Sequence, residues 1–284
     1  MPQPSEKSKS VAGVNQQFIG FEVDTNLEME LRHYLYQLDV DINIETQLIA
    51  VYGLLAKTKE ADAEITQEIQ GWEEHARTTS DDDAQQYAEG QWIDCLHRAT
   101  YHGAAHSMAA LGMLAPLLET VFHQYLRAIC QKLTELGEPI GTHERWARPS
   151  RKAYDCHYVW RNGGFDKDVV SGIGQMVEAL DMARCLPADF QQVLSALIEY
   201  RNKMFHNGFE WPMEERRDFE QRLQEKGFPT EWFTKATSGD DPVVFYMSET
   251  MIRKVMETID GVLDGIAGYT RDRVTPLRLK REYP

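Results

Sequence analysis

The chain has 284 residues, of which 42% are hydrophobic and 26% are charged. This composition is typical of a soluble globular protein and excludes a collagen-like or disordered chain. Thirty Lys and Arg against 45 Asp and Glu leave a net charge of -15, which excludes a protein that coats nucleic acid through its overall field. Four widely spaced cysteines without a CxxC pair exclude a zinc ribbon and a dense disulfide scaffold. A reducing cytoplasm fits this cysteine usage best.

Residues 1–17 are polar and lack the apolar stretch of a secretory signal, so they are predicted to be a flexible N-terminal tail. Residues 18–85 are predicted to be an N-terminal helical segment. Its apolar residues recur mostly at steps of three, four or seven, which predicts a helix over about 27–57. These residues are Leu31, Leu35, Leu38, Ile42, Ile49 and Tyr52. A second, shorter helix is predicted at about 61–78, before the turn-forming sequence TTSDDD.

The segment over about 86–137 is predicted to be one long helix or two stacked helices, because Pro116 removes a backbone donor. Its longest uncharged run, 99–118, contains Tyr, two His and a Pro, and is too polar to cross a bilayer. After Pro116 the apolar residues repeat in near-heptad pairs, which predicts a buried helix. The stretch from there to Lys167 lacks periodicity and is predicted to be a structured connection.

Two further helices are predicted, one around 173–183 and one that begins at Phe190 and ends at Asn207-Gly208. The sequences EWFTKA and PVVFYM flank SGDD, which predicts a small hairpin. Ser248 is predicted to cap a last helix that reaches about residue 267. Together these elements predict an all-α fold over 86–270, a helical bundle with a small β-hairpin near the C-terminus, followed by a C-terminal tail at 271–284.

The end of the helix that begins at Phe190 carries the residues best suited to chemistry. The inward stripe of this helix extends through 190, 194, 197, 201 and 205, so Arg201 stands where an apolar residue is expected. A guanidinium keeps its proton, and on a buried stripe it requires an anionic partner or a groove that admits substrate. Glu119, on the buried helix, is the candidate partner. His206 follows Arg201 by about one and a half turns, so a phosphate-binding fork and a proton-transferring imidazole border one cleft.

The string YRNKMFHNG, from Tyr200 to Gly208, resembles the R-polar-x3-H signature of HEPN-domain ribonucleases. The resemblance covers roughly 90–270 and places the signature, as in that family, on a late helix of an all-α bundle. It implies a HEPN-like, metal-independent endoribonuclease without a cofactor, which forms a homodimer to build a composite site. In that site His206 would act as general base or acid while the RNA 2′-OH attacks the adjacent phosphate. Arg201 would hold the phosphate, and Asn202 would orient the scissile group or His206.

Four basic residues are predicted to bind the RNA substrate: Lys203, Arg148, Arg151 and Lys152. The last three belong to the stretch 144–161, which also contains Arg145 and Arg161 and is interleaved with Trp and Tyr. Cations mixed with aromatic residues suit the phosphates and stacked bases of single-stranded RNA. The alternative is an ordinary loop whose aromatic residues fill gaps in the bundle.

By analogy with the family, the chain is predicted to be a cytoplasmic toxin or antiviral defence effector, with an antitoxin or defence-complex partner and no membrane association. Gly208 departs from the branch paired with nucleotidyltransferase antitoxins, which carries a Tyr there as the modification target. Two alternatives stay open. One is a catalytically inactive HEPN-like adaptor module. The other is a metal-dependent bundle built on His97, His102 and His106, with Asp94 one turn before His97 and Glu119 before His123.

Overall fold

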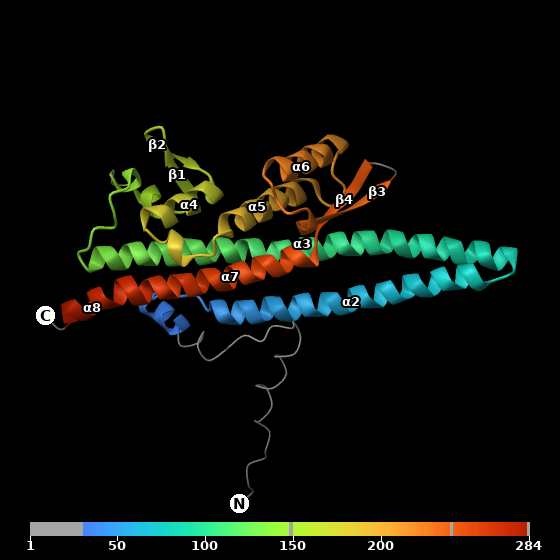
Figure 1. Ribbon diagram of the computed structural model, residues 1–284, viewed down its shortest axis with the longest axis horizontal. Coiled ribbons are helices and arrows are strands. Elements are labelled where there is room, and N and C mark those ends of the chain that lie inside the picture. Colours follow the sequence, from blue (N-terminus) through green and yellow to red (C-terminus); the bar gives the residue numbers. More distant parts are fainter. Residues whose placement is uncertain (1–30, 148–149, 239–240, 283–284) are drawn as a thin grey trace, which may run out of the picture.

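The computed structural model describes residues 31–147, 150–238 and 241–282. This part of the chain is mostly helical and carries two small antiparallel hairpins (Figure 1). The predicted tail 1–17 and the predicted substrate-binding residue Arg148 lie outside the described residues.

The helices have the following bounds: α2, Ile44–Thr78; α3, Asp82–Glu135; α4, Val169–Ala179; α5, Phe190–Asn207; α6, Met213–Glu225; α7, Glu249–Tyr269; and α8, Thr275–Glu282. The strands are β1, Tyr158–Arg161; β2, Gly164–Lys167; β3, Phe233–Ser238; and β4, Asp241–Met247. Short 3-10 helices lie at His33–Leu38, Glu144–Trp146, Arg151–Tyr154, Ala183–Cys185 and Thr230–Trp232. A π-helical turn, Thr270–Val274, joins α7 to α8.

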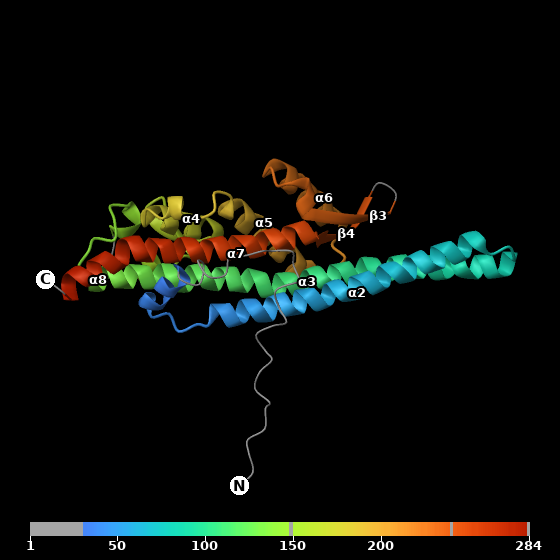
Figure 2. The same ribbon diagram turned by 60° about the horizontal axis from the view of Figure 1, so that its bottom comes forward.

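The central element is α3, which lies between α2 on one side and α4–α6 with the hairpins on the other, while α7 runs beside it (Figure 2). The C-terminal half of α3 is buried because its apolar residues recur every three or four positions. Its fully buried residues include Leu111, Leu114, Leu118, Phe122, Leu126 and Ile129. The helix continues through Pro116, so the single long helix is the correct one of the two predicted arrangements.

One 18-residue window of α3 is long and apolar enough to cross a membrane. Half of that window is buried inside the described structure. A core helix of a water-soluble protein has this property, because its apolar side chains pack against neighbouring helices.

Of the predicted helix over 27–57, residues 27–30 lie outside the described residues, and the described part is interrupted at 39–43. The described chain begins with the 3-10 helix His33–Leu38, which ends at Asp39, where a φ of 51° stops helical hydrogen bonding. A new helix then begins: Asn43 caps α2, and its side chain accepts a hydrogen bond from the N–H of Thr46 at 3.0 Å.

Helices α2 and α3 form a long antiparallel pair that extends past the other elements (Figures 1 and 2). The break predicted between 57 and 61 is absent from α2, and the predicted division at 85/86 falls inside α3. Ile49, predicted to face inward, is 60% exposed, whereas its neighbour Leu48 is buried. The N-terminal segment and the bundle therefore share one helix. At the other end, the residues predicted as a tail are helical as far as Glu282.

The hairpin predicted near the C-terminus is confirmed as β3 and β4, in which Phe233 pairs with Met247. The second hairpin, β1 with β2, lies in the stretch predicted as a structured connection, for which no strands were predicted. Its turn is Asn162-Gly163, with φ values of 52° and 79°. Two positive φ angles in a two-residue turn match the right-handed twist of the strands it joins.

Candidate functional site

Helix α5 presents Arg201, Asn202 and His206 near its C-terminal end. The helix ends at Asn207, as predicted, because Gly208 adopts a φ of 72° and donates its N–H to the carbonyl of Met204 at 2.8 Å. The buried residues of α5 are Phe190, Val193, Leu194, Ala196, Leu197, Ile198, Tyr200 and Met204. They hold one side of the helix in the core and leave the other side open to solvent.

An aromatic cluster fixes the end of α5. Tyr200 is fully buried and donates its hydroxyl to the carbonyl of Phe245 at 3.0 Å. Trp211, which follows the helix, stacks on Phe245 with ring centroids 5.7 Å apart and donates its indole N–H to the carbonyl of Gly208 at 2.8 Å. Buried aromatic side chains therefore anchor the chain on both sides of the motif.

Arg201 forms an ion pair with Glu119 of α3, the partner suggested by the sequence. The Arg201 side chain is 29% exposed and that of Glu119 is 19% exposed, so the pair is partly shielded from water. Nη1 of Arg201 donates to Glu119, and Nη2 lies 3.5 Å from Oδ1 of Asn202. A guanidinium has five N–H donors, so Arg201 keeps donors for a second anion.

The inward stripe predicted through residue 205 is wrong at its last position. Phe205 is 59% exposed, and the inward place is taken by Met204, which is fully buried. At about 100° per residue, Met204 points toward the middle of the buried face, whereas His206 points to the opposite side of the helix. Arg201 points about 60° from Met204, on the same side of the helix as the buried Leu194, and its side chain is 29% exposed.

Asn202 and His206 are exposed and lie one turn apart on the solvent side of α5. Among the residues that the structure describes, His206 forms no hydrogen bond and no ion pair, so its imidazole is accessible to a substrate. The ring of Phe205 reaches α3 at Gly112, where an added Cβ would lie 4.0 Å from Cζ of Phe205. All three polar residues lie on the last two turns of α5, whose end at Asn207 the sequence predicted.

Lys203 has a different role from the predicted one. Its ammonium lies 2.7 Å from Oδ2 of Asp218 and also binds Glu215, both on α6, and its side chain is only 12% exposed. These two carboxylates raise the pKa of Lys203, although burial opposes them. Lys203 therefore ties α5 to α6 and is not free to bind RNA.

We expect Lys203→Met to lower the free energy of unfolding by about 1 kcal/mol, the size of a partly exposed ion pair. Cleavage of RNA should change by less than about threefold, because the ammonium already has two carboxylate partners. Urea unfolding and an RNA cleavage assay measure the two effects. Lys280→Met, on the exposed side of α8, is the matched control and should alter neither quantity. A large loss of cleavage in Lys203→Met with unchanged stability would restore the predicted role in substrate binding.

The basic stretch 144–161 offers fewer free cations than its sequence suggested. Arg145 is fully buried, and Arg161 pairs with Asp166 at 2.8 Å. Arg151 and Lys152 are exposed in the turn before β1, where the Lys152 ammonium lies 4.8 Å from the ring centroid of Tyr158. Figure 1 shows β1 and β2 beside α4, apart from α6 and the end of α5. These two predicted substrate-binding residues therefore belong to another part of the fold than His206.

The predicted metal group on α3 is not assembled in the described residues. Asp94 and His97 are exposed, whereas His102 and His106 line a cavity of about 400 Å³ between α2, α3, β4 and α7. Much of this lining is apolar, as at Ile252.

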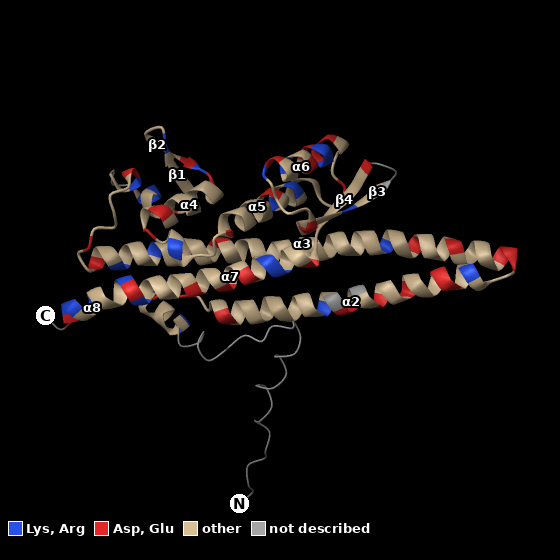
Figure 3. Cartoon of the chain, viewed as in Figure 1, with Lys and Arg blue, Asp and Glu red and all other residues tan. Residues whose placement is uncertain are grey.

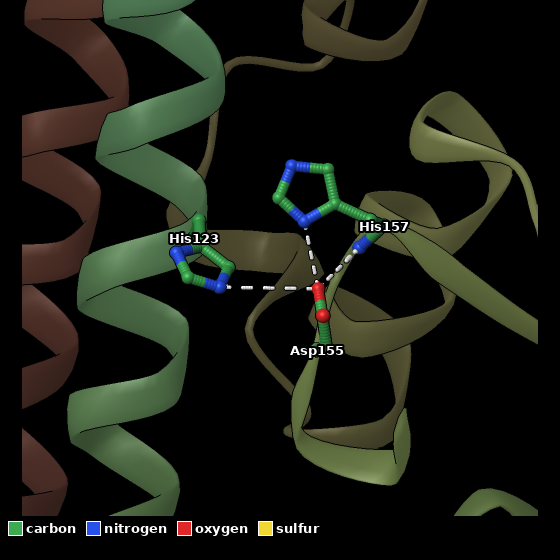
Figure 4. Close-up of side chains that lie close together, drawn as sticks. All are labelled: His123, Asp155 and His157. Atoms are coloured by element: carbon green, nitrogen blue, oxygen red, sulfur yellow. Dashed lines mark hydrogen bonds and ion pairs between the residues drawn. The ribbon is translucent and has the colours of Figure 1, made fainter. Parts of the chain in front are cut away.

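A different set of donors does converge. His123, Asp155 and His157 place one donor atom each within 4.8 Å of the others (Figure 4). The sequence placed His123 in the α3 group beside Glu119 and did not connect it with Asp155 and His157, which lie in the segment just before β1. The pattern Asp-x-His at 155–157 was the available signal.

No family model, no curated protein and no solved structure matches the chain. The functional conclusion therefore rests on the exposed end of α5 and its ion pair with Glu119.

Proposed function

We propose that the chain is a metal-independent endoribonuclease of the HEPN type that acts as a homodimer. The observation that carries the proposal is the open end of α5, where Asn202 and His206 face solvent and Arg201 borders them. A guanidinium fork binds two phosphoryl oxygens, and an imidazole transfers protons at neutral pH. Together on one phosphodiester, these groups would supply anion binding and proton transfer.

The proposed reaction is transesterification within the RNA. The imidazole of His206 accepts the proton of the 2′-OH while the 2′-oxygen forms a bond to the adjacent phosphorus. The bond from phosphorus to the 5′-oxygen breaks, and that oxygen takes up a proton, leaving a 2′,3′-cyclic phosphate and a 5′-OH. Arg201 stabilises the charge that develops on the phosphoryl oxygens. Asn202, whose Oδ1 lies near Nη2 of Arg201, orients the scissile group.

A second copy of the chain completes this site. One α5 supplies one imidazole, whereas the reaction requires a base and an acid. Two α5 ends that face each other across a two-fold axis supply both. Phe205, exposed between Asn202 and His206, gives the same face an aromatic side chain of the kind enriched at protein interfaces.

The distribution of charged residues limits how strongly the chain attracts RNA. Figure 3 shows Lys and Arg spread among Asp and Glu over α2, α3 and α6, and not gathered on one element. With a net charge of -15, the chain attracts RNA only where basic groups are local. Binding by a few phosphate contacts should therefore depend only modestly on salt, because few counterions are released.

The biological role we propose is that of a cytoplasmic toxin or antiviral defence effector, since cleavage of cellular RNA stops growth. This step rests on analogy with the family. An antitoxin or defence-complex partner would restrain it, by a route other than modification of a Tyr at position 208, which is Gly here. The second candidate is a catalytically inactive adaptor, in which the pair of Arg201 with Glu119 is structural.

The test is cleavage of end-labelled single-stranded RNA by the purified full-length chain in the presence of EDTA. We expect products with a 2′,3′-cyclic phosphate and a 5′-OH, and a dimer by sedimentation. A folded dimer that leaves RNA intact would favour the adaptor. Cleavage that requires an added metal ion and leaves a 3′-OH would contradict the proposed chemistry.

A further inference from the structure

A group of two histidines and one aspartate joins α3 to the segment that precedes β1. Oδ1 of Asp155 accepts hydrogen bonds from Nδ1 of His157 at 2.7 Å and from the backbone N–H of the same residue at 2.9 Å. Nε2 of His123 lies 3.9 Å from this oxygen, and the two imidazole rings have centroids 5.0 Å apart. Figure 4 shows both rings directed at Asp155. The three side chains are a quarter to a third exposed, so a dissolved ion can reach them.

The segment that carries Asp155 and His157 is held in place by buried groups. Arg145, fully buried, donates to the carbonyl of Asp155 at 2.7 Å and to that of Ala153 at 2.6 Å. The carbonyl of His157 accepts from the N–H of Asp168 at 2.9 Å. Such support outside the donor set fixes ligand orientation in natural metal sites.

Helix α4 packs closely against the same segment. A Cβ added at Gly172 would lie 2.2 Å from the carbonyl oxygen of Cys156 and 2.8 Å from that of Tyr158. The backbone on both sides of His157 therefore packs directly on α4, which fixes the point from which the imidazole extends toward Asp155.

We propose that His123, Asp155 and His157 bind a divalent transition-metal ion of the Zn²⁺ class, with a water molecule in the fourth position. Two imidazole nitrogens and one carboxylate oxygen form a common ligand set for such ions. Bonds of about 2.0 to 2.2 Å place tetrahedral ligand atoms about 3.3 Å apart. His123 therefore has to approach Asp155 from its present 3.9 Å, and the 2.7 Å hydrogen bond between His157 and Asp155 has to lengthen, within a group whose donor atoms now lie within 4.8 Å of one another. His157 binds through Nδ1, and its proton moves to Nε2.

The bound ion would connect α3 to the segment before β1. The site lies one helical turn from Glu119, the partner of Arg201, but shares no residue with the proposed ribonuclease site. Metal binding is therefore separate from the RNA chemistry, and each proposal has its own test.

The test is titration of the full-length chain with Zn²⁺ by calorimetry, after a chelator has been used and removed by dialysis. We expect one equivalent per chain and at least tenfold weaker binding in His157→Gln and Asp155→Asn, since removing a ligand costs at least as much as removing a supporting contact, about 10- to 100-fold. Co²⁺ bound in the same place should give the intense visible bands of a tetrahedral site, and these should be lost in both variants. Circular dichroism confirms that the variants are folded.

Two matched controls define the alternatives. His102→Gln removes a histidine of the α3 group suggested by the sequence, and His206→Ala removes the proposed catalytic imidazole; both should bind Zn²⁺ like the parent chain. Unchanged affinity in His157→Gln, or loss of binding in His102→Gln, would overturn the proposal. Cleavage of RNA in EDTA is read in a separate assay, so failure of the metal site leaves the ribonuclease proposal standing, and the reverse also holds.

Discussion

His206→Ala should lower the rate of RNA cleavage by about 10² to 10⁴-fold, the usual contribution of a general acid or base. The loss should appear in the chemical step, because the imidazole moves a proton and does not anchor the substrate. Stability and dimerisation should be unchanged, since His206 is exposed and forms no hydrogen bond or ion pair with the described residues. Single-turnover cleavage of labelled RNA measures the rate, and urea unfolding measures the stability.

The control for this variant is His97→Ala, an exposed histidine on α3 far along the chain from the motif. It should cleave RNA at the rate of the parent chain. If His206→Ala also cleaves RNA within about threefold of the parent rate, the imidazole takes no part in the reaction. That result would favour the hypothesis of a catalytically inactive adaptor.

Arg201→Ala should lower RNA cleavage by about 10² to 10³-fold, as expected when a donor to a developing oxyanion is removed. This variant also leaves Glu119 partly buried without its partner, so stability should fall as well. The double variant Arg201→Ala with Glu119→Ala separates the two effects. It removes the unpaired carboxylate and should regain most of the stability while cleavage stays low.

Glu119→Gln is the matched single change on the other side of the pair. It keeps a hydrogen-bond acceptor and leaves the guanidinium in place, so cleavage should change by less than about tenfold. Equal losses of cleavage in Arg201→Ala and Glu119→Gln would mean that the ion pair stabilises the fold and that Arg201 does not act on the phosphate. Arg201→Lys keeps the charge without the planar fork and should recover only part of the rate.

The helices that could be predicted are those with clear signals at both ends. Helix α7 begins after Ser248, whose hydroxyl accepts a hydrogen bond from the N–H of Met251, and α5 ends at Gly208 with a positive φ. Between these signals, regular apolar spacing marks the buried face. The place of Arg201 and His206 on a helix end followed from these local rules.

Helix α6 was missed because its sequence, MEERRDFEQRLQE, is mostly charged. A single fully buried residue, Phe219, packs it against the aromatic cluster under α5. A single apolar side chain produces no hydrophobic periodicity from which a helix can be predicted. Because α6 was not predicted, its two carboxylates that bind Lys203 were not predicted either, and Lys203 was assigned to substrate binding.

Other misses have different causes. The turn Asn162-Gly163 is a strong hairpin signal. The hairpin β1 with β2 could therefore have been predicted from the sequence, although it was not. The meeting of His123 with His157 has no local signal, since it depends on how the segment before β1 packs on α3. Burial of Arg145 likewise depends on the carbonyl groups that surround it.

The long pair of α2 and α3 has a thin interior where it leaves the bundle. Over 56–103, apart from residues whose side chains are not described, the buried residues are Ala76, Ala88 and Cys95. At about 1.5 Å per residue, the part of α2 over 56–78 and the antiparallel part of α3 over 82–103 each extend by roughly 35 Å. Because so little apolar area holds the two helices together there, the arm opens at a lower free energy than the bundle unfolds. Its amide protons should exchange with solvent first, and a protease should cut the arm while α5 keeps its native shape.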